Sequence, residues 1–345
     1  MKQPSGDDVV GTTPSQRGQL PSAVTSRSPE LSEFTTLQIA RELVARMNEG
    51  QAWENNSVQL WVSNQLAHGL REQTNLHNNR FGLARYKQLF GGMYARMKDR
   101  VPLAGATVID VGCGGTNPGA FLFLLLILGA KRGIGIDLDE IRHPDIALRA
   151  LADLAAAMLL DPTAIVGDLA PSRHAILDNI ADIDFGKLAK GDRTGISEDR
   201  LAYWQQSASS IKLGDAEADL VFSNAFLEHV PAPDEVIREL ARITKPGGVG
   251  VHVIDLTDHR RYNSDCHPLQ FLAEPGPGMA LGTNRMRQSH FVAEFEAHGF
   301  IIKSTDVLLR IDAEQRSQVD FSPYYASLSE DDLEVGIVRF TVQRT

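Results

Sequence analysis

The sequence is poor in cysteine, in basic charge and in long apolar runs. Its 345 residues include two cysteines, Cys113 and Cys266, too few for a disulfide framework or a clustered set of zinc ligands. Lys and Arg number 34 against 44 Asp and Glu, a net charge of −10, so the chain lacks the long-range attraction to phosphates of a basic protein. These absences favour a reducing, cytoplasmic setting and argue against nucleic acid as a partner.

Membrane-spanning and secretion segments are not expected. The longest apolar run, 120–130, is roughly half of the ~20 residues needed to cross a bilayer, and it predicts a buried helix. The first residues lack a charged region followed by an apolar one, so no secretion signal is expected. Residues 1–32, rich in Ser, Thr, Pro and Gly, predict a disordered tail. Apolar residues at helical spacing then predict a helical N-terminal extension or lid over 33–100.

Residues 101–345 predict one α/β domain. Short apolar strands alternate with helices from Thr107 onward, which is typical of a Rossmann-like, mostly parallel sheet with helices on both faces. A polar, turn-rich stretch at about 161–200 interrupts this alternation and predicts an insertion. Strand-like segments at 301–309 and 335–342 predict a closing antiparallel pair.

The first predicted strand runs into the glycine-rich segment DVGCGG, residues 110–115. Glycines there let the backbone turn sharply and approach a ligand closely. A dinucleotide fingerprint would need its third glycine at the position of Asn117, which argues against NAD. The second predicted strand ends at Asp137, 25 residues after Gly112, where a carboxylate can accept hydrogen bonds from both ribose hydroxyls of a nucleoside.

Four segments in order, DVGCGG, GIDLDE, DLVFSNAFLEHV and ITKPGGVGVHVID, resemble the class I S-adenosylmethionine-dependent methyltransferases. The resemblance covers about 105–255 strongly and continues more weakly to 343. It implies S-adenosylmethionine as the cofactor, in a site to which each motif contributes. By this resemblance Asp110, Gly112 and Gly114 lie beside the methionine part, Asp137 holds the ribose and Leu138 flanks the adenine.

The residue that meets the adenine amino group departs from the family pattern. That family usually has an acidic residue followed by alanine at a set distance before the fourth strand. Counting back from Asp219 by this spacing reaches Ser207 and Ala208, so a serine oxygen would accept the hydrogen bond without charge assistance. Asp168 supplies an acid but lies 51 residues before Asp219. Spacing favours Ser207 and leaves Asp168 as the alternative.

Residues that follow the fourth and fifth strands should face the transferred methyl group, because ligands of open α/β sheets lie at the carboxyl ends of the strands. They are Asn224, Glu228, His229, Asp255, Asp258 and His259. Asn224 belongs to the expected cofactor site. His229 and His259 are candidate catalytic bases for a hydroxyl acceptor, with Asp255 orienting His259. The alternative is that the histidines only shape the pocket.

The acidic loop and the basic residues around it suggest two further contacts. Asp255, Asp258 and His259 offer ligands for Mg²⁺, but a solvated acidic loop has the same pattern, so no metal ligand is assigned. The pairs Arg260–Arg261 and Arg285–Arg287 are candidates for anionic groups of the substrate. Solvated loop arginines are the alternative.

Two other features complete the sequence expectations. Arg80 and Arg85, in the N-terminal extension, are candidates to bind the methionine carboxylate, or they belong to a simple connection. His252 is interior to a predicted strand, which indicates a core or edge residue whose hydrogen bonds are satisfied.

The acceptor is expected to be a small molecule or glycan. The segments HVIDLTDH, NRMRQSHF and FEAHGF resemble those of bacterial methyltransferases of polysaccharide or secondary-metabolite pathways, which implies O-methylation of a sugar or glycan hydroxyl. An NAD-dependent oxidoreductase is one alternative. A non-catalytic methyltransferase-like interaction module is another, which the serine at 207 favours.

Overall fold

A computed structural model describes residues 82–95, 97, 101–262, 264–279 and 282–345. The tail predicted for 1–32 and Arg80 lie outside these ranges, as does most of the extension predicted for 33–100. The described part of that extension contains helix α3 (Leu83–Gly92). The predicted boundaries of tail and extension stay predictions.

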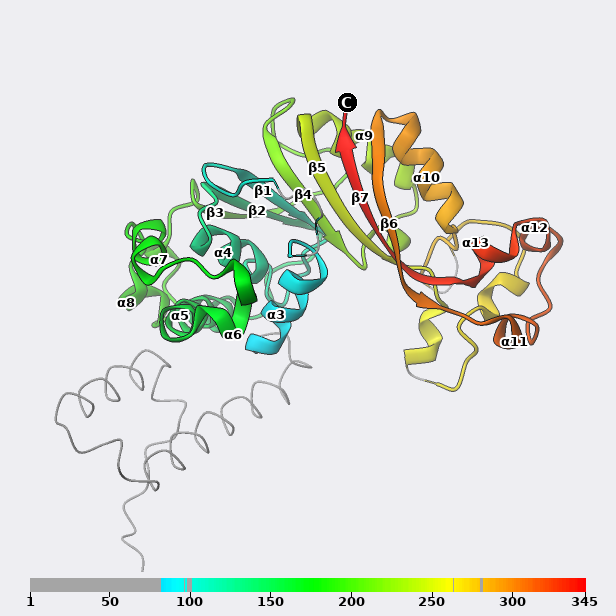
Figure 1. Ribbon diagram of the computed structural model, residues 1–345, viewed down its shortest axis with the longest axis horizontal. Helices are drawn as coiled ribbons and strands as arrows, with labels where there is room; N and C mark the ends of the chain where they lie inside the picture. Colours follow the sequence, from blue (N-terminus) through cyan, green and yellow to red (C-terminus); the bar gives the residue numbers. More distant parts are fainter. Residues whose placement is uncertain (1–81, 96, 98–100, 263, 280–281) are drawn as a thin grey trace, which may run out of the picture.

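One seven-stranded sheet, in the order β3-β2-β1-β4-β5-β7-β6, forms the centre of the molecule (Figure 1). The first five strands in this order are parallel, and β7 is antiparallel to both β5 and β6. The predicted Rossmann-like sheet and its closing antiparallel pair are thus confirmed. The strands are β1 (Thr107–Val111), β2 (Arg132–Asp137), β3 (Leu201–Gln205), β4 (Ala218–Asn224), β5 (Thr244–Asp255), β6 (Phe300–Arg310) and β7 (Val335–Arg344).

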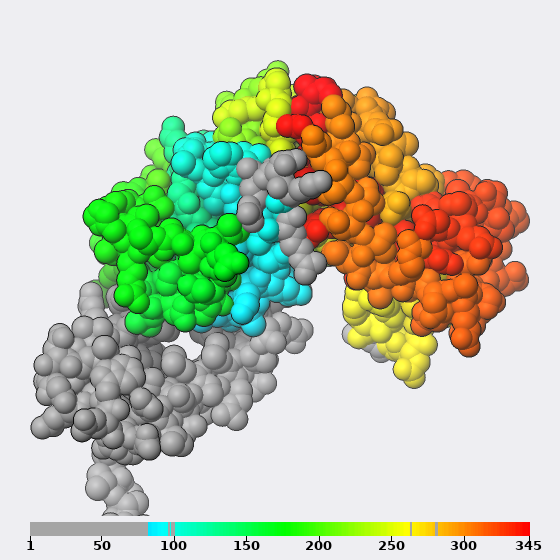
Figure 2. Space-filling view, viewed as in Figure 1, coloured from blue at the N-terminus to red at the C-terminus, as the bar shows by residue number. Residues whose placement is uncertain are grey.

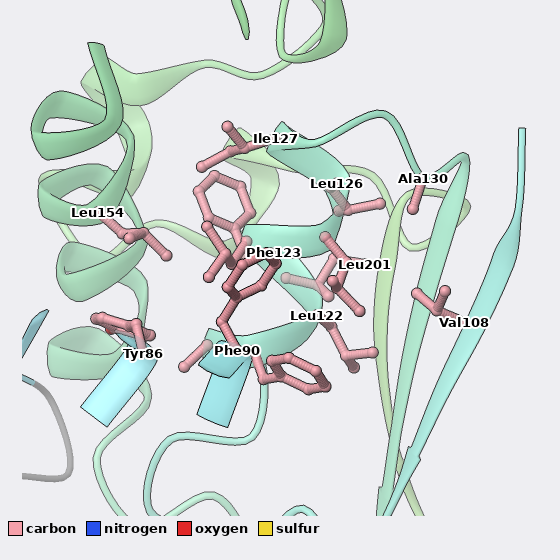
Figure 3. Close-up of a cluster of buried hydrophobic side chains, with 14 of the residues drawn as sticks. Tyr86, Phe90, Val108, Leu122, Phe123, Leu126, Ile127, Ala130, Leu154 and Leu201 are labelled. Atoms are coloured by element: carbon pink, nitrogen blue, oxygen red, sulfur yellow. The ribbon is translucent and has the colours of Figure 1, made fainter. Parts of the chain in front are cut away.

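Helices cover both faces of this sheet. On one face α4 (Ala120–Ile127) and α5 (Pro144–Leu160) pack with α3 in a single apolar core (Figure 3). All eight residues of α4 are buried, so the longest apolar run of the sequence is a core helix, as predicted. On the other face α9 (Pro233–Ile243) and α10 (Gln288–Ala297) pack in a second core. Neighbouring residues of β1 divide between these cores, as side-chain alternation along a buried strand requires.

The predicted insertion lies between α5 and β3. It contains α6 (Pro162–Val166), α7 (Arg173–Asn179) and α8 (Phe185–Leu188), which contribute buried residues to the core around α4. Asp161, Ser172 and Asp184 accept hydrogen bonds from backbone N–H groups in the first turns of these helices, so the turn-like composition reflects helix caps.

No helix of the described ranges is by itself long and apolar enough to cross a membrane. Taken together, Pro144–Leu160 and Pro162–Leu169 have the required length and composition, but the chain bends by 109° between them.

Residues 256–287 and 311–334 pack together beyond the edge of the sheet, at the end of the molecule away from α5 to α8 (Figure 2). Their own apolar cluster includes Phe271, Leu272, Ile311 and Tyr325. This part contains η5 (His259–Tyr262), η6 (Gln270–Ala273), α11 (Ala313–Arg316), α12 (Pro323–Ala326) and α13 (Glu330–Glu334). The composition of 255–289 indicates only a loop, and nothing in the sequence indicates this packing.

Candidate functional site

A glycine-rich loop follows β1. Gly112 and Gly114 have φ angles of +72° and +75°, a conformation that favours glycine. A Cβ atom at Gly112 would lie 2.3 Å from the ring of Phe226, whereas a Cβ at Gly114 would have no atom within 4 Å. The loop therefore presents a bare stretch of backbone to open space at Gly114.

Asp137, at the carboxyl end of β2, lies beside this loop. Its Oδ2 accepts a hydrogen bond from the N–H of Gly114 at 2.7 Å, and its Oδ1 accepts one from the N–H of Asp139 at 3.0 Å. Each carboxylate oxygen can accept a further hydrogen bond. Leu138, the next residue, leaves 70% of its surface exposed. A carboxylate and an exposed apolar side chain are thus adjacent, as ribose and adenine binding would require.

Asp110 and helix α3 both lie next to the glycine-rich loop that follows β1. Burial raises the pKa of Asp110 to about 7, while the nearby positive charge of Arg85 opposes this rise and the negative charge of Asp137 adds to it. On the next residue of α3, the Tyr86 hydroxyl accepts a hydrogen bond from Asn117 at 3.2 Å. The described part of the extension therefore brings Arg85 to the expected methionine end of the site.

The chain after β3 approaches Asp137 as well. The N–H of Gln206 donates to the Asp137 carbonyl at 2.9 Å, which places the exposed Ser207 and the buried Ala208 just beyond that contact. Asp168 lies in η2 (Gly167–Leu169), within the insertion. This arrangement favours Ser207 for the adenine side, and that assignment stays a prediction.

Glu228 lies beyond the carboxyl end of β4, where Asn224 is the last strand residue. It belongs to η4 (Leu227–His229), and 2% of its surface is exposed. Its Oε1 accepts a hydrogen bond from the N–H of Asp255 at 3.1 Å, whereas its buried Oε2 has no hydrogen-bond partner. Burial raises the pKa of Glu228 to about 8. The sequence placed Glu228 near the methyl group but gave it no role.

The three predicted catalytic residues lie together. The ring centroids of His229 and His259 are 4.8 Å apart, and His259 Nε2 lies 3.7 Å from Asp255 Oδ2. His229 Nδ1 is 2.7 Å from the carbonyl oxygen of Gly282. Since a carbonyl only accepts, Nδ1 carries a proton, and in the neutral ring Nε2 has the lone pair. Burial lowers the pKa of His259, and the charge of Asp255 opposes this.

Asp255 and Asp258 have different partners. Asp255 accepts hydrogen bonds from Thr257 and from the hydroxyl of Tyr262. Asp258 is fully buried and pairs with Arg260 at 2.5 Å. The grouping of Asp255, Asp258 and His259 around one cation is therefore wrong, because Arg260 neutralises Asp258.

The prediction that Arg285 and Arg287 bind substrate is also wrong. Both are buried, and Arg287 is 0% exposed. Arg287 donates to four backbone carbonyls, and Arg285 donates to carbonyls of 271–278. The Arg287 guanidinium therefore joins Leu256 to 332–335, and the Arg285 guanidinium stabilises the stretch 271–278.

A hollow with polar walls lies elsewhere, lined by Gly105, Lys131, Asn179 and Arg200 among others. Lys131 immediately precedes β2 and Arg200 immediately precedes β3, so this hollow is at the amino ends of the strands. It is separate from the glycine-rich loop and the histidine pair.

The sequence of this chain is similar to those of known methyltransferases. Residues 175–251 match the model of a methyltransferase domain family. A methyltransferase of uncharacterised function from Mycobacteroides abscessus is 35% identical over 57 residues, 16% of this chain and 22% of that protein. The alignment thus spans about a fifth of the curated relative's length.

Proteins of known structure that resemble this chain have lower sequence identity to it. An S-adenosylmethionine-dependent methyltransferase from Mesorhizobium loti is 15% identical, with 76% of this chain and 100% of that one covered and a TM-score of 0.41. A geranyl diphosphate C-methyltransferase from Streptomyces coelicolor A3(2) is 14% identical, with 76% and 79% covered and a TM-score of 0.42. The strand order and the glycine-rich loop are those expected from the sequence resemblance to class I S-adenosylmethionine-dependent methyltransferases, and the chain matches a methyltransferase domain family over 175–251.

Proposed function

We propose that this protein transfers the methyl group of S-adenosylmethionine to a hydroxyl of a small polar acceptor. One observation carries the proposal. The glycine-rich loop, Asp137 and the His229–His259 pair all follow carboxyl ends of parallel strands, where ligands of such sheets bind. A cofactor site and a pair of basic side chains therefore share one edge of the sheet.

The cofactor would lie across the ends of β1, β2 and β3. The backbone at Gly114 and the carboxylate of Asp110 receive the methionine part, with Arg85 near its carboxylate. Asp137 accepts hydrogen bonds from the ribose hydroxyls. Leu138 covers one face of the adenine, and Ser207 with Ala208 lies at its edge. Asn224, at the end of β4, lines the side toward the acceptor.

The chemistry needs alignment and one proton acceptor. The acceptor oxygen forms a bond to the methyl carbon, the carbon–sulfur bond breaks, and its electron pair stays on sulfur, giving S-adenosylhomocysteine. The hydroxyl proton passes to an imidazole, either His229 at its free Nε2 or His259, whose ring Asp255 orients. Holding donor and acceptor in line supplies most of the acceleration.

A sugar or glycan hydroxyl is the acceptor that the polar surroundings favour. His229 and Tyr262 both pack against His259 and offer hydrogen-bonding groups, and 57% of the Tyr262 surface is exposed. The net charge of −10 also disfavours a polyanionic acceptor. O-methylation of a neutral polyol is consistent with both features.

Calorimetric titration with S-adenosylmethionine and, separately, with NADH tests the cofactor. We expect the wild type to bind S-adenosylmethionine alone and Asp137→Ala to bind it roughly 10- to 100-fold more weakly, since a charge-assisted hydrogen-bond acceptor is lost. Asp199→Ala serves as the matched control and should bind normally, because Asp199 is exposed and lies before the amino end of β3. Binding of NADH instead would support an oxidoreductase, and binding of neither would refute the cofactor site.

Once binding is established, the acceptor is sought by measuring methyl transfer to a panel of sugars. Loss of transfer in His229→Ala and His259→Ala with retained cofactor affinity would support the roles proposed for these histidines. Unchanged transfer in both variants would refute them. Cofactor binding without any transfer would favour an interaction module.

A further inference from the structure

Glu228, His229 and His259 form a compact set of metal-binding side chains. One ligand atom from each lies within 4.8 Å of the others. Two come from η4, after β4, and the third comes from η5, after β5. The set therefore depends on neighbouring strands ending at the same edge, and not on a single flexible loop.

The buried carboxylate is the strongest sign of a ligand. Glu228 is 2% exposed, and its Oε2 has no hydrogen-bond partner in the described structure. Leaving a carboxylate oxygen buried without a partner is costly. The second oxygen, Oε1, is fixed by the N–H of Asp255, so the orphaned Oε2 is held in place. A positive ion beside Oε2 would remove this cost.

Each of the two imidazoles also has a nitrogen atom available to bind a metal ion. His229 donates from Nδ1 to the Gly282 carbonyl, which leaves Nε2 as a lone-pair donor. A metal-binding histidine commonly makes such an outer hydrogen bond to a backbone carbonyl. The buried Nε2 of His259 also lacks a hydrogen-bond partner in the described structure. Two of the three side chains thus have unpartnered buried atoms, and the third has its tautomer fixed.

We propose that Glu228, His229 and His259 bind one divalent transition-metal ion, with positions left open for a further oxygen ligand. Two imidazoles and one carboxylate are typical of Zn²⁺ or Fe²⁺ sites, whereas Mg²⁺ prefers oxygen ligands alone. Around Zn²⁺, ligand atoms at about 2.0 Å would lie about 3.3 Å from one another. The present ligand atoms lie within 4.8 Å of one another, so binding would draw the imidazoles closer to Oε2. His229 is exposed, which leaves access for a further ligand.

The chemical consequence rests on the proposed function. A bound ion would take an acceptor hydroxyl as its further ligand and ease loss of its proton. The imidazoles would then act as ligands, and the proton would pass to solvent. Metal binding itself requires no cofactor, so the two proposals can be tested apart.

Titration of the full-length protein with Co²⁺ and with Zn²⁺ tests the site. Co²⁺ gives visible absorption bands that report its coordination, and calorimetry with Zn²⁺ gives affinity and stoichiometry. We expect one ion per chain and roughly 100-fold weaker binding in His229→Ala and in His259→Ala, because each removes a ligand. Glu228→Gln keeps the shape of the buried side chain and should weaken binding as well. Mg²⁺ should not compete.

A matched control is His298→Ala, which removes a histidine that lies 3.7 Å from Glu294 on one helix. This variant should bind the ion as the wild type does. Absence of binding, or equal weakening in His298→Ala and His229→Ala, would overturn the metal site. Titration of the same samples with S-adenosylmethionine separates the two proposals. Cofactor binding without metal binding refutes only the metal site, and metal binding without cofactor binding refutes only the proposed function.

Discussion

His252 allows a sharp test of how burial controls the stability of this fold. It lies within β5 and is 0% exposed. Its Nδ1 is 2.8 Å from the hydroxyl oxygen of Ser223 on β4, and its ring stacks on Phe295 of α10 at 5.2 Å. Its Nε2 is buried without a hydrogen-bond partner. Burial alone lowers its pKa to about 3, and no charged group contributes. The sequence left a core and an edge position open for His252. The structure buries it, but only Nδ1 has a hydrogen-bond partner.

The sign of the effect follows from the proton count in each state. In the unfolded chain the imidazole has a pKa of about 6.5, so below that pH the unfolded state binds a proton that the folded state does not. Stability is therefore fully present above pH 6.5 and is lost as the pH falls toward 3. Between pH 8 and pH 5 this single group should lower the free energy of unfolding by about 2 kcal/mol.

His252→Phe removes the titrating group and keeps a flat ring against Phe295. The variant leaves the Ser223 hydroxyl without its partner, which lowers stability by a similar amount at every pH. Denaturant unfolding of both proteins at pH 8, 7, 6 and 5 should show the variant losing about 2 kcal/mol less than the wild type over this range.

The matched control is His174→Phe, because 87% of the His174 side chain is exposed on α7. Its stability should follow the wild-type pH dependence to within about 0.5 kcal/mol. Parallel curves for the wild type and His252→Phe would refute the reasoning. They would mean that the imidazole is protonated in the folded state or reaches water.

Three further predictions concern the cofactor loop and the outer part of the molecule. Gly112→Ala should lower the free energy of unfolding by more than about 2 kcal/mol in denaturant titrations, since φ is +72° and the new Cβ would lie 2.3 Å from Phe226; wild-type stability would contradict this. Arg287→Met should cost at least about 3 kcal/mol by the same assay, because a buried guanidinium that donates to four carbonyls is lost; a loss below 1 kcal/mol would show that water replaces it. Affinity for S-adenosylmethionine should rise roughly fivefold from pH 6 to pH 7 as Asp110, with a pKa of about 7, ionises. Asp110→Asn should abolish that rise in calorimetry, and an unchanged rise in the variant would exclude Asp110 as its cause.

The parts of the molecule that the sequence predicted are those set by local patterns. Alternation of short strands with helices predicted the parallel sheet, because each element must bury its own apolar face. The apolar run 120–130 is too short to cross a bilayer, which predicted a buried helix. The structure buries all residues of α4. The strand end predicted for Asp137 is confirmed, since Asp137 is the last residue of β2. Its 2.7 Å hydrogen bond from the Gly114 N–H was not predicted.

Arg285 and Arg287 show where local patterns fail. Two arginines in a polar loop have the same sequence signature whether they face solvent, substrate or the backbone of a distant segment. The partners of Arg287 include carbonyls of 332–335, more than 40 residues away, whereas Arg285 donates to carbonyls of 271–278. Only the packing of 256–287 against 311–334 decides the outcome, and no short-range periodicity encodes that packing. A rule that assigns loop arginines to substrate therefore needs knowledge of burial first.

Glu228 shows the same dependence at the site itself. The sequence of Leu227–His229 does not indicate whether the Glu228 carboxylate is buried. Asn284 decides it, because its side chain donates to the carbonyls of Leu227 and Val230 while its N–H donates to that of Glu228. The Gly282 carbonyl, two residues earlier, fixes the His229 ring. The stretch 282–284 thus sets the geometry of η4 from outside the sheet. Changes in this stretch should alter chemistry at the acceptor side while leaving the cofactor loop intact.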